Sequence, residues 1–183
     1  IWILLDECFV PFLDDAKLHS QIGALSRYPN LIILRAFTKL YAMAGLRLGY
    51  LLCCNEALMR RIASCGQPWS VSAPAQAAGV AALKDTAYVD AVRRLIHTER
   101  AYLTGALQEI GMKVMGSKAN YIFFKCPIKN LKERLLRENI LIRSCANFHG
   151  LDKQFYRISV RTHEENKRLI AALTNQMAGG NPI

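Results

Sequence analysis

A lysine and an arginine follow a short apolar run near the start of the chain. The run is LIIL, at Leu31–Leu34, and the next stretch, RAFTKLYAMAGLRLGY at 35–50, contains Lys39 and Arg47. Near-continuous aliphatic residues are typical of a strand buried on both faces of a parallel sheet, and open α/β sheets bind ligands at the carboxyl ends of their strands. The sequence therefore predicts that Lys39 and Arg47 converge on one pocket, although two unrelated surface cations at a strand end would give the same pattern.

These residue types suit a carbonyl compound that also carries a phosphate. A lysine amine can form a Schiff base with a carbonyl group, and an arginine can hold a phosphate through two parallel hydrogen bonds. Asp6 and Glu7 close the preceding apolar run, IWILL, so a carboxylate from a neighbouring strand can face the same crevice. Pyridoxal phosphate requires a lysine, a carboxylate for its ring nitrogen and a phosphate cradle. Asp6 would equally suit a helix or loop cap.

Three apolar runs are predicted to position these side chains as strands, at Trp2–Leu5, Leu31–Leu34 and Gly49–Cys54. A helix is predicted at Asp15–Ser26, and another follows the turn at Pro74. Strands that alternate with helices favour an α/β sheet.

A long helix is predicted from Thr86 to a stop signal at Gly111, because apolar residues recur there at steps of three or four. Such a helix of about 24 residues spans roughly 36 Å and suits a link between two domains. A second, α+β unit is expected after it. Its expected strands lie at 112–115, 120–125, 140–143 and 156–160, and its expected helices at Leu131–Glu138 and His163–Asn175.

The two helices of that unit carry capping signals at their N-termini. Thr162 with Glu165 forms a standard capping box, and Asn130 with Glu133 forms a weaker one. The final stretch, MAGGNPI at 177–183, is rich in glycine and asparagine and is expected to fray.

The composition limits the classes of protein to which the chain can belong. Its 183 residues are 52% hydrophobic and 21% charged, and no apolar run approaches the roughly 18 residues that span a bilayer. The net charge is +10, but the cations are scattered, so we expect an anionic small-molecule ligand and neither nucleic acid nor membrane. The six cysteines form no CxxC pair and the histidines show no metal-ligand spacing. We therefore expect reduced thiols, no metal site and a cytoplasmic location.

Three stretches of the chain resemble a known enzyme family. LLDECFVPF, RAFTKLYAMAGLRLGY and YRISVRTHEENKRLI are similar to successive signatures of the aspartate-aminotransferase superfamily of pyridoxal-phosphate enzymes. The resemblance is strongest to the branch that contains histidinol-phosphate aminotransferase and threonine-phosphate decarboxylase, and it runs over nearly the whole chain. The block S/T-K-x-x-x-x-A-G-L-R-x-G-Y is highly specific, whereas DE followed by an aromatic residue is weak alone.

The resemblance implies an α/β fold in two parts. Residues 1–85 would form part of the cofactor-binding large domain, an aminotransferase-like, mainly parallel sheet with helices on both faces. Residues 86–111 would form the connecting helix, 112–176 a small C-terminal α+β domain and 177–183 a frayed tail. Because the chain begins with IWILLDE, without an initiator methionine or a leader pattern, we expect it to be the C-terminal portion of a longer protein.

The resemblance also assigns residues to the cofactor, pyridoxal 5'-phosphate. Lys39 would carry the Schiff base as the catalytic residue, and Asp6 would pair with the pyridine nitrogen. Thr38 and Arg47 would bind the cofactor phosphate.

Two positions depart from the family pattern. Phe9 stands where the family often has a tyrosine that donates a hydrogen bond to the cofactor's phenolic oxygen, and phenylalanine cannot donate. Ala36 stands where many relatives have a hydroxyl, so the phosphate cradle would be leaner on that side. The essential groups remain.

The resemblance places four further residues on the substrate side. Arg157 would grip the substrate α-carboxylate, and Arg143 would bind the substrate's own phosphate. Asn120 would line the same side, and Arg161, in SVRT, would add a cation where the aminotransferases commonly have glycine. Arg143 and Arg157 could equally be surface cations on strands, and Asn120 could equally be a turn residue.

The stretch RSCANFHGLDKQFYRISVRT resembles the decarboxylase more than the aminotransferase. The resemblance then implies decarboxylation of L-threonine O-3-phosphate to (R)-1-amino-2-propanol O-2-phosphate, a step that supplies the aminopropanol linker of cobalamin. Histidinol-phosphate aminotransferase, or a related class I/II aminotransferase, stays open because both reactions begin from the same cofactor-bound substrate.

A hypothesis of another class is a non-catalytic fragment that retains the fold. The family's N-terminal half, which supplies a glycine-rich phosphate loop and a ring-stacking aromatic residue, has no counterpart in this sequence. We therefore expect the isolated chain to be poorly active or inactive, and the full-length parent to be a homodimeric enzyme by analogy with the family.

Overall fold

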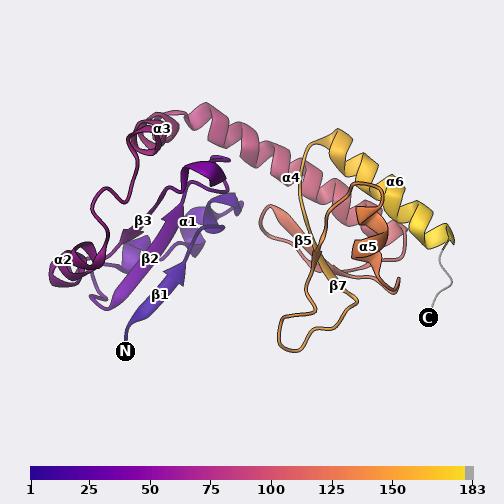
Figure 1. Ribbon diagram of the computed structural model, residues 1–183, viewed down its shortest axis with the longest axis horizontal. Helices are drawn as coiled ribbons and strands as arrows, with labels where there is room; N and C mark the ends of the chain where they lie inside the picture. Colours follow the sequence, from indigo (N-terminus) through magenta and orange to yellow (C-terminus); the bar gives the residue numbers. More distant parts are fainter. Residues whose placement is uncertain (180–183) are drawn as a thin grey trace. The chain divides into compact units, whose positions relative to one another are not determined.

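The computed structural model describes residues 1–179 and divides into two compact units. The first unit runs from Ile1 to Val92, and the second begins at Arg93. Each unit has its own sheet, with strand order β1-β2-β3 in the first and β4-β5-β7-β6 in the second (Figure 1). Within residues 1–179, no helix is both long and apolar enough to cross a membrane.

The sheet of the first unit has one parallel and one antiparallel pairing. β1 (Ile3–Asp6) runs parallel to β2 (Leu31–Ala36), and β3 (Gly49–Leu52) runs antiparallel to the other edge of β2. The mainly parallel sheet that we expected is therefore only half parallel in this unit. The reason is that segment 37–48 folds into turns and one short 3-10 helix in place of the crossover helix that a parallel return usually requires.

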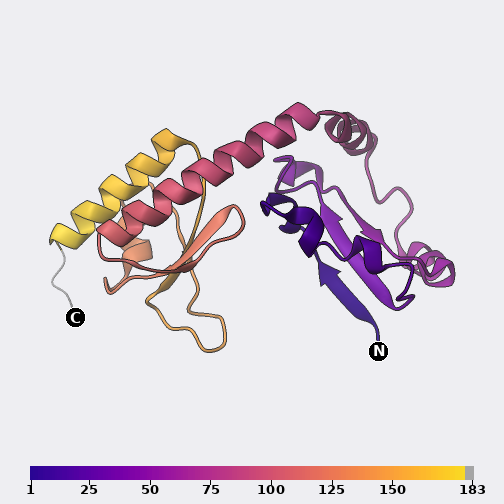
Figure 2. The ribbon, with the colours of Figure 1, turned by 180° about the vertical axis from the view of Figure 1, so that it is seen from behind.

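The helix predicted at Asp15–Ser26 is wrong as a continuous element. The chain forms only α1 (Ala16–His19) and a 3-10 turn at Ile22–Ala24, with extended backbone at Ser20 between them. The break has a tertiary cause, because the Ser20 hydroxyl and the backbone N–H of residue 21 both donate hydrogen bonds to a buried glutamate on another segment. Figure 2 shows these short turns lying across the sheet of the first unit.

Two helices follow β3 in the first unit. α2 (Glu56–Cys65) was not predicted, although Asn55, a preferred N-cap residue, caps it through its side chain. α3 (Ala73–Lys84) was predicted, and it begins at Ser72, whose hydroxyl accepts an N–H from the first turn.

α3 approaches the segment after β2 at a glycine. A Cβ atom at Gly79 would lie 2.5 Å from Leu48 Cδ2 and 3.8 Å from the Phe37 ring. Real Cβ atoms do not come so close to a neighbour, so a larger residue here requires the Leu48 side chain to move. Through Gly79, α3 supports the segment that carries the predicted lysine.

The long helix is confirmed as α4 (Thr86–Glu109), which has 24 residues. It ends where the sequence predicted, because Gly111 adopts a φ of +80° that favours glycine. Its C-terminal two-thirds buries an apolar stripe in the second unit. The stripe comprises Ile96, Leu103 and Leu107.

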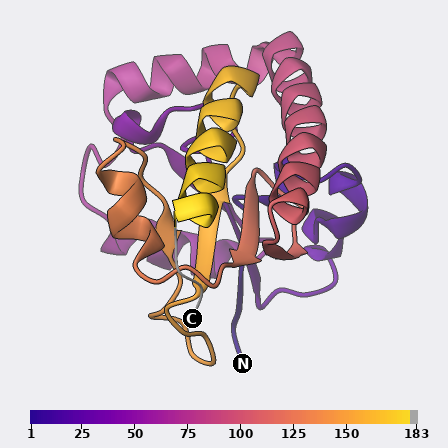
Figure 3. The same ribbon diagram turned by 90° about the vertical axis from the view of Figure 1, so that its right-hand side faces the viewer.

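The second unit is a four-stranded antiparallel sheet with helices on one face. Its strands are β4 (Lys113–Gly116), β5 (Tyr121–Lys125), β6 (Arg143–Ser144) and β7 (Phe155–Ser159), and its further helices are α5 (Leu131–Leu136) and α6 (His163–Gly179). Figure 3 shows α5 and α6 covering the sheet. Residues of β5 and β7 alternate between a buried face and a half-buried face, as a strand period of two requires. The buried face carries Ile122, Phe124, Tyr156 and Ile158.

Several local predictions for the second unit are wrong. Asn130 adopts a left-handed conformation with φ of +56°, so its side chain does not cap α5 as we expected. The strand expected at 140–143 shrinks to the two residues of β6. The end of the chain expected to fray is helical as far as Gly179, and residues 180–183 lie outside the described residues.

Two other predictions for the chain are confirmed. Glu165 accepts hydrogen bonds from the Thr162 hydroxyl and N–H and so forms the predicted capping box of α6. All six cysteines are free thiols, and two of them, Cys126 and Cys145, are buried in the second unit.

Candidate active site

Asp6 lies at the carboxyl end of β1, in register with Leu34 of β2. Its Oδ1 accepts the backbone N–H of Cys8 at 2.9 Å, and the Cys8 thiol donates a second hydrogen bond to the same carboxylate. These two bonds, the thiol bond first, hold the pKa of Asp6 below its ordinary value. The Asp6 carboxylate is exposed and therefore stays ionised at neutral pH.

The pKa of the Cys8 thiol responds to the charged residues at this end of the sheet. Burial, the hydrogen bond to Asp6 and the Asp6 charge raise the pKa of Cys8 to about 11, whereas the charges of Arg35 and Lys39 act in the opposite direction. One thiol is thus bonded to the carboxylate and lies within electrostatic range of the lysine. The parallel register places Asp6 and Lys39 at the same edge, because Asp6 pairs with Leu34 and Lys39 follows the end of β2.

Lys39 is held on a loop that is anchored on both sides. Phe37 and Leu40 are each 5% exposed, so the exposed Lys39 stands between buried neighbours. The Phe37 N–H donates to the Leu48 carbonyl, and the Ala42 N–H donates to the Lys39 carbonyl. Thr38, half-buried, precedes the lysine in the same turn.

Arg47 sits where the backbone takes an unusual conformation. Both Ala42 and Arg47 have φ of +54°, a left-handed conformation that costs a non-glycine residue roughly 1–3 kcal/mol. The Arg47 guanidinium is exposed and donates to the Ala44 carbonyl at 3.3 Å. Two such positions within one short loop are typical of ligand-binding segments, because the surrounding structure must maintain the strain.

Arg143 and Arg157 meet on the open face of the second sheet. They are direct cross-strand partners of β6 and β7, so their side chains leave the same face. The Arg157 guanidinium lies over the Tyr121 ring, 4.9 Å from its centroid, and Arg143 donates to Asn147 Oδ1 at 3.3 Å. Arg157 lines a pocket of about 490 Å³ on this face. Its walls also include Lys118, Tyr121, Phe123 and Phe148.

Asn120 presents a buried acceptor at the start of β5. Its carbonyl accepts the Val160 N–H at 2.9 Å, but its side-chain Oδ1 is buried and has no hydrogen-bond partner within residues 1–179. A buried polar atom without a partner is costly, so this atom is a place where a bound donor would be stabilised.

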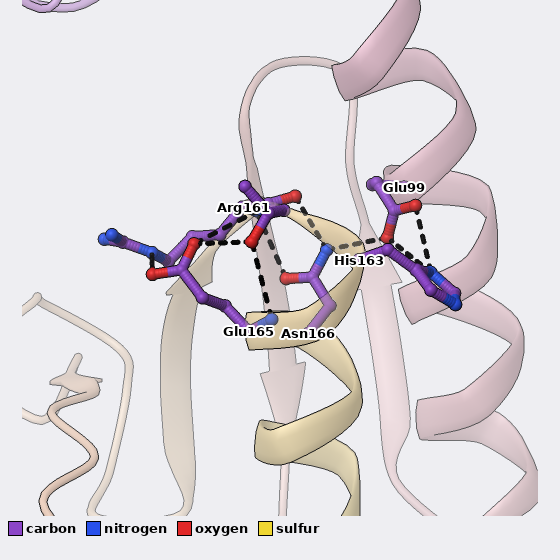
Figure 4. Close-up of polar contacts among 6 residues, drawn as sticks. Glu99, Arg161, His163, Glu165 and Asn166 are labelled. Carbon is purple, nitrogen blue, oxygen red and sulfur yellow. Dashed lines mark hydrogen bonds and ion pairs between the residues drawn. The ribbon is translucent and has the colours of Figure 1, made fainter.

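Arg161 is held apart from this pair of arginines. Its Nε donates to Glu165 Oε1 at 2.7 Å, and it lines a separate pocket of about 260 Å³ (Figure 4). The structure therefore brings Arg143 and Arg157 together and engages Arg161 in an ion pair with the first turn of α6.

A buried polar cluster that the sequence analysis missed fixes the backbone at Arg161. The Asn166 side chain, on α6, donates to the Arg161 carbonyl and accepts the Arg161 N–H, and it also donates to Glu99 Oε2 at 2.9 Å. Glu99 on α4 is 6% exposed, and His163 Nδ1 lies 3.1 Å from its Oε1 (Figure 4). A charged residue on the apolar face of α4 was the only signal in the sequence.

The predicted cofactor residues and the predicted substrate residues belong to different units. Asp6, Thr38, Lys39 and Arg47 lie in the first unit, and Asn120, Arg143, Arg157 and Arg161 lie in the second. A second residue pair that the sequence analysis did not identify, Glu7 with Arg35, lies beside Asp6 in the first unit.

Comparison with known proteins gives consistent matches over nearly the whole chain. A family model described as aminotransferase class I and II matches residues 1–173. A threonine-phosphate decarboxylase of Salmonella typhimurium is 41% identical over 180 residues, which are 97% of this chain and 49% of that protein. The chain spans about half the length of the curated relatives it matches.

Solved structures give the same fold. The histidinol-phosphate aminotransferase of Clostridium acetobutylicum matches with a TM-score of 0.92 and 33% identity, over 97% of this chain and 54% of that one. A histidinol-phosphate aminotransferase of Sinorhizobium meliloti, solved in complex with pyridoxal-5'-phosphate, matches with a TM-score of 0.84 and 26% identity, over 97% of this chain and 49% of that one.

Proposed function

Because the chain belongs to the class I and II aminotransferase family, we propose that it supplies the lysine, the carboxylate and the arginines of a pyridoxal-phosphate enzyme acting on a phosphorylated amino acid. The observation that carries the proposal is the register of the first sheet: Asp6 ends β1, which runs parallel to β2, and Lys39 follows β2 at the same edge. A pyridoxal-phosphate protein among the structural relatives supports the choice of cofactor.

The residues present fit this cofactor in their chemistry. Asp6 is ionised and exposed, as a partner for a protonated ring nitrogen must be, and Lys39 is an exposed primary amine. Thr38 and Arg47 offer a hydroxyl and a guanidinium on the same loop for the phosphate. When bound, pyridoxal phosphate supplies an electron sink for the bond that breaks at the substrate's α-carbon.

Each of these residues then has a defined task. Asp6 would keep a negative charge beside the ring nitrogen and so favour its protonated form. Lys39 would bind the cofactor covalently, and its amine would be the base or acid that moves a proton at the substrate's α-carbon. Arg157 holds the α-carboxylate through two parallel hydrogen bonds, and Arg143, on the same face, holds the substrate phosphate. Asn120 Oδ1 accepts a hydrogen bond from the substrate side.

Within the family, we favour decarboxylation of L-threonine O-3-phosphate, in the formation of the aminopropanol phosphate of cobalamin. The 41% identity to the Salmonella decarboxylase supports this choice, and so do two arginines on one face for a substrate with two anionic groups. Histidinol-phosphate aminotransferase remains the second candidate, because relatives of that name are 36% identical over nearly all of this chain. Arg161 bonds Glu165 through Nε, so a contact with the substrate would come from its Nη groups.

The first experiment is an absorbance titration of the chain and of its full-length parent with pyridoxal phosphate. We expect a visible absorption band that borohydride removes, with the cofactor mass fixed on the peptide that contains Lys39. Lys39→Ala should lose both signals, and Lys84→Ala, at an exposed position on α3, should keep them. A full-length parent that stays colourless would refute the proposal and would favour a non-catalytic protein that retains the fold.

The second experiment separates the two reactions. Release of carbon dioxide from threonine phosphate without a keto acid indicates the decarboxylase, and formation of glutamate from 2-oxoglutarate indicates the aminotransferase. We also propose, by analogy with the family, that the parent is a homodimer, which sedimentation of the full-length protein can test.

A further inference from the structure

A buried carboxylate follows Asp6 directly. Glu7 is 3% exposed, and its backbone N–H donates to the Leu34 carbonyl at 3.0 Å, so the parallel pairing of β1 with β2 continues one residue beyond Asp6. Side chains of successive residues in an extended segment point to opposite sides. Glu7 therefore projects away from the side that Asp6 faces, and it has no part in the proposed cofactor contacts.

Both oxygens of this carboxylate are bound by protein groups. The Gln21 N–H donates to Oε1 at 2.7 Å, and the Ser20 hydroxyl donates to Oε2 at 2.9 Å. Arg35 Nη2, from β2, donates to Oε2 at 2.7 Å and to the Ser20 hydroxyl at 3.0 Å. The Glu7 side chain is 4% exposed and the Arg35 side chain 14% exposed, so the ion pair is largely removed from water.

A pair of this kind contributes little net stability, because taking two charges out of water offsets much of their attraction. The main effect of the pair is to fix the positions of the segments that it joins. Glu7 is bonded to β2 through its backbone and through its side chain, and to the segment after α1 through residues 20 and 21. Asp6 directly precedes Glu7, and Lys39 follows β2, the strand that carries Arg35. The pair therefore joins the two segments that carry Asp6 and Lys39.

We propose that the Glu7–Arg35 pair, with Ser20, is a positioning device that fixes the spacing between the Asp6 carboxylate and the Lys39 amine. We call these three residues the Glu7 clamp. Lys39 would hold the aldehyde end of the cofactor and Asp6 its ring nitrogen, so the two side chains must keep one separation. This inference rests on the proposed function and names residues that do not touch the cofactor themselves.

The variant that tests the clamp is Glu7→Gln in the 183-residue chain. It keeps the shape and one acceptor oxygen for the Gln21 N–H, but it removes the charge and turns an amide N–H₂ group toward the Arg35 guanidinium, where two donors cannot bond. The matched control is Glu56→Gln, which also removes one carboxylate from an arginine ion pair. The Glu56–Arg60 pair is exposed on α2, with side chains 86% and 74% exposed.

The first readout needs no cofactor. Hydrogen exchange measured by mass spectrometry should quicken at least tenfold in the peptides that cover 5–9 and 35–41 of Glu7→Gln, and should not change in Glu56→Gln. If Glu7→Gln fails to fold, Ser20→Ala replaces it, because that change removes one donor to the carboxylate and leaves the charges paired. Unchanged exchange in both peptides of the folded variant would overturn the inference.

The second readout separates positioning from a structural role. Pyridoxal phosphate with borohydride labels accessible lysines, and the ratio of labelling at Lys39 to labelling at the exposed Lys84 measures the special reactivity of Lys39. We expect this ratio to fall about tenfold in Glu7→Gln and to stay constant in Glu56→Gln. An unchanged ratio would overturn the inference, even if stability falls. If the wild-type chain shows no preference for Lys39, the labelling is repeated on the full-length parent with the same substitutions. No preference in the parent refutes the proposed function, and the exchange measurement then decides whether the clamp orders this edge.

Discussion

Removing the Asn166 side chain is expected to loosen the start of α6 in the second unit. Asn166 is 1% exposed and makes three hydrogen bonds, one to the Glu99 carboxylate and two to the backbone of Arg161. In Asn166→Ala, the Glu99 carboxylate stays buried with one partner fewer, and its remaining polar partner within residues 1–179 is His163. The asparagine therefore connects α4, the end of β7 and α6.

The cost can be worked out from these contacts. A hydrogen bond to a charged group contributes about 1.5–3 kcal/mol, and a neutral one about 0.5–1.5 kcal/mol. The Arg161 backbone lies beside an exposed residue and can be rehydrated, so its two bonds belong at the low end of that range. We expect Asn166→Ala to lose about 3 kcal/mol, which corresponds to roughly a hundredfold faster exchange through the same opening.

Hydrogen exchange is the suitable assay because it resolves the second unit by peptide. A single unfolding curve for a chain with two compact units need not be two-state. Peptides from 160–170 should show the loss, and peptides from β1 and β2 should not. The control is Asn175→Ala, the same deletion at an exposed position of α6, which we expect to change stability by at most about 0.5 kcal/mol through helix propensity. Equal exchange in the two variants would refute the reasoning.

Two further predictions concern the first unit. At pH 8 the Cys8 thiol should alkylate slowly and its rate should rise with pH through about 11, because a raised pKa keeps the thiol protonated; Asp6→Asn removes the bonded charge and should speed the reaction several-fold. No change in Asp6→Asn would contradict the thiol–carboxylate bond. Gly79→Ala places a Cβ against Leu48; overpacking costs about 1–3 kcal/mol, and the helix propensity of alanine offsets about 1 kcal/mol of it. Hydrogen exchange should quicken in peptides of α3, whereas the control Gly105→Ala, where a Cβ meets nothing within 4 Å, should slow exchange in α4. A neutral result would show that Leu48 moves aside without cost.

Local signals in the sequence predicted much of the fold. The strands of the first unit lie within two residues of the predicted runs, because buried aliphatic residues and flanking turn residues are themselves the cause of these strands. α4 and its stop at Gly111 followed from apolar spacing and from one glycine, and the capping box at Thr162 followed from residues three positions apart. Such features need no distant partner.

The predictions that failed, and the features that were missed, depend on partners distant in the chain. The helix predicted at Asp15–Ser26 fails because a carboxylate at residue 7 takes the hydrogen bonds of residues 20 and 21. Asn130 has the right type for a cap, but its left-handed backbone directs the side chain elsewhere. Glu99 is a charged residue on an apolar helix face, and its partners Asn166 and His163, both far along the chain, explain its burial.

In the candidate site too, some features follow from local sequence and others only from tertiary structure. The motif around Lys39 determined by itself which amine, which arginine and which hydroxyl share one loop, because that loop is a continuous stretch of sequence. Tertiary structure alone decided that Asp6 and Lys39 lie at one edge of the sheet, that Arg143 and Arg157 leave the same face, and that Glu7 is paired with Arg35. The physical reason is that strand register and buried ion pairs join residues distant in the chain, and their geometry exists only when the sheet has formed.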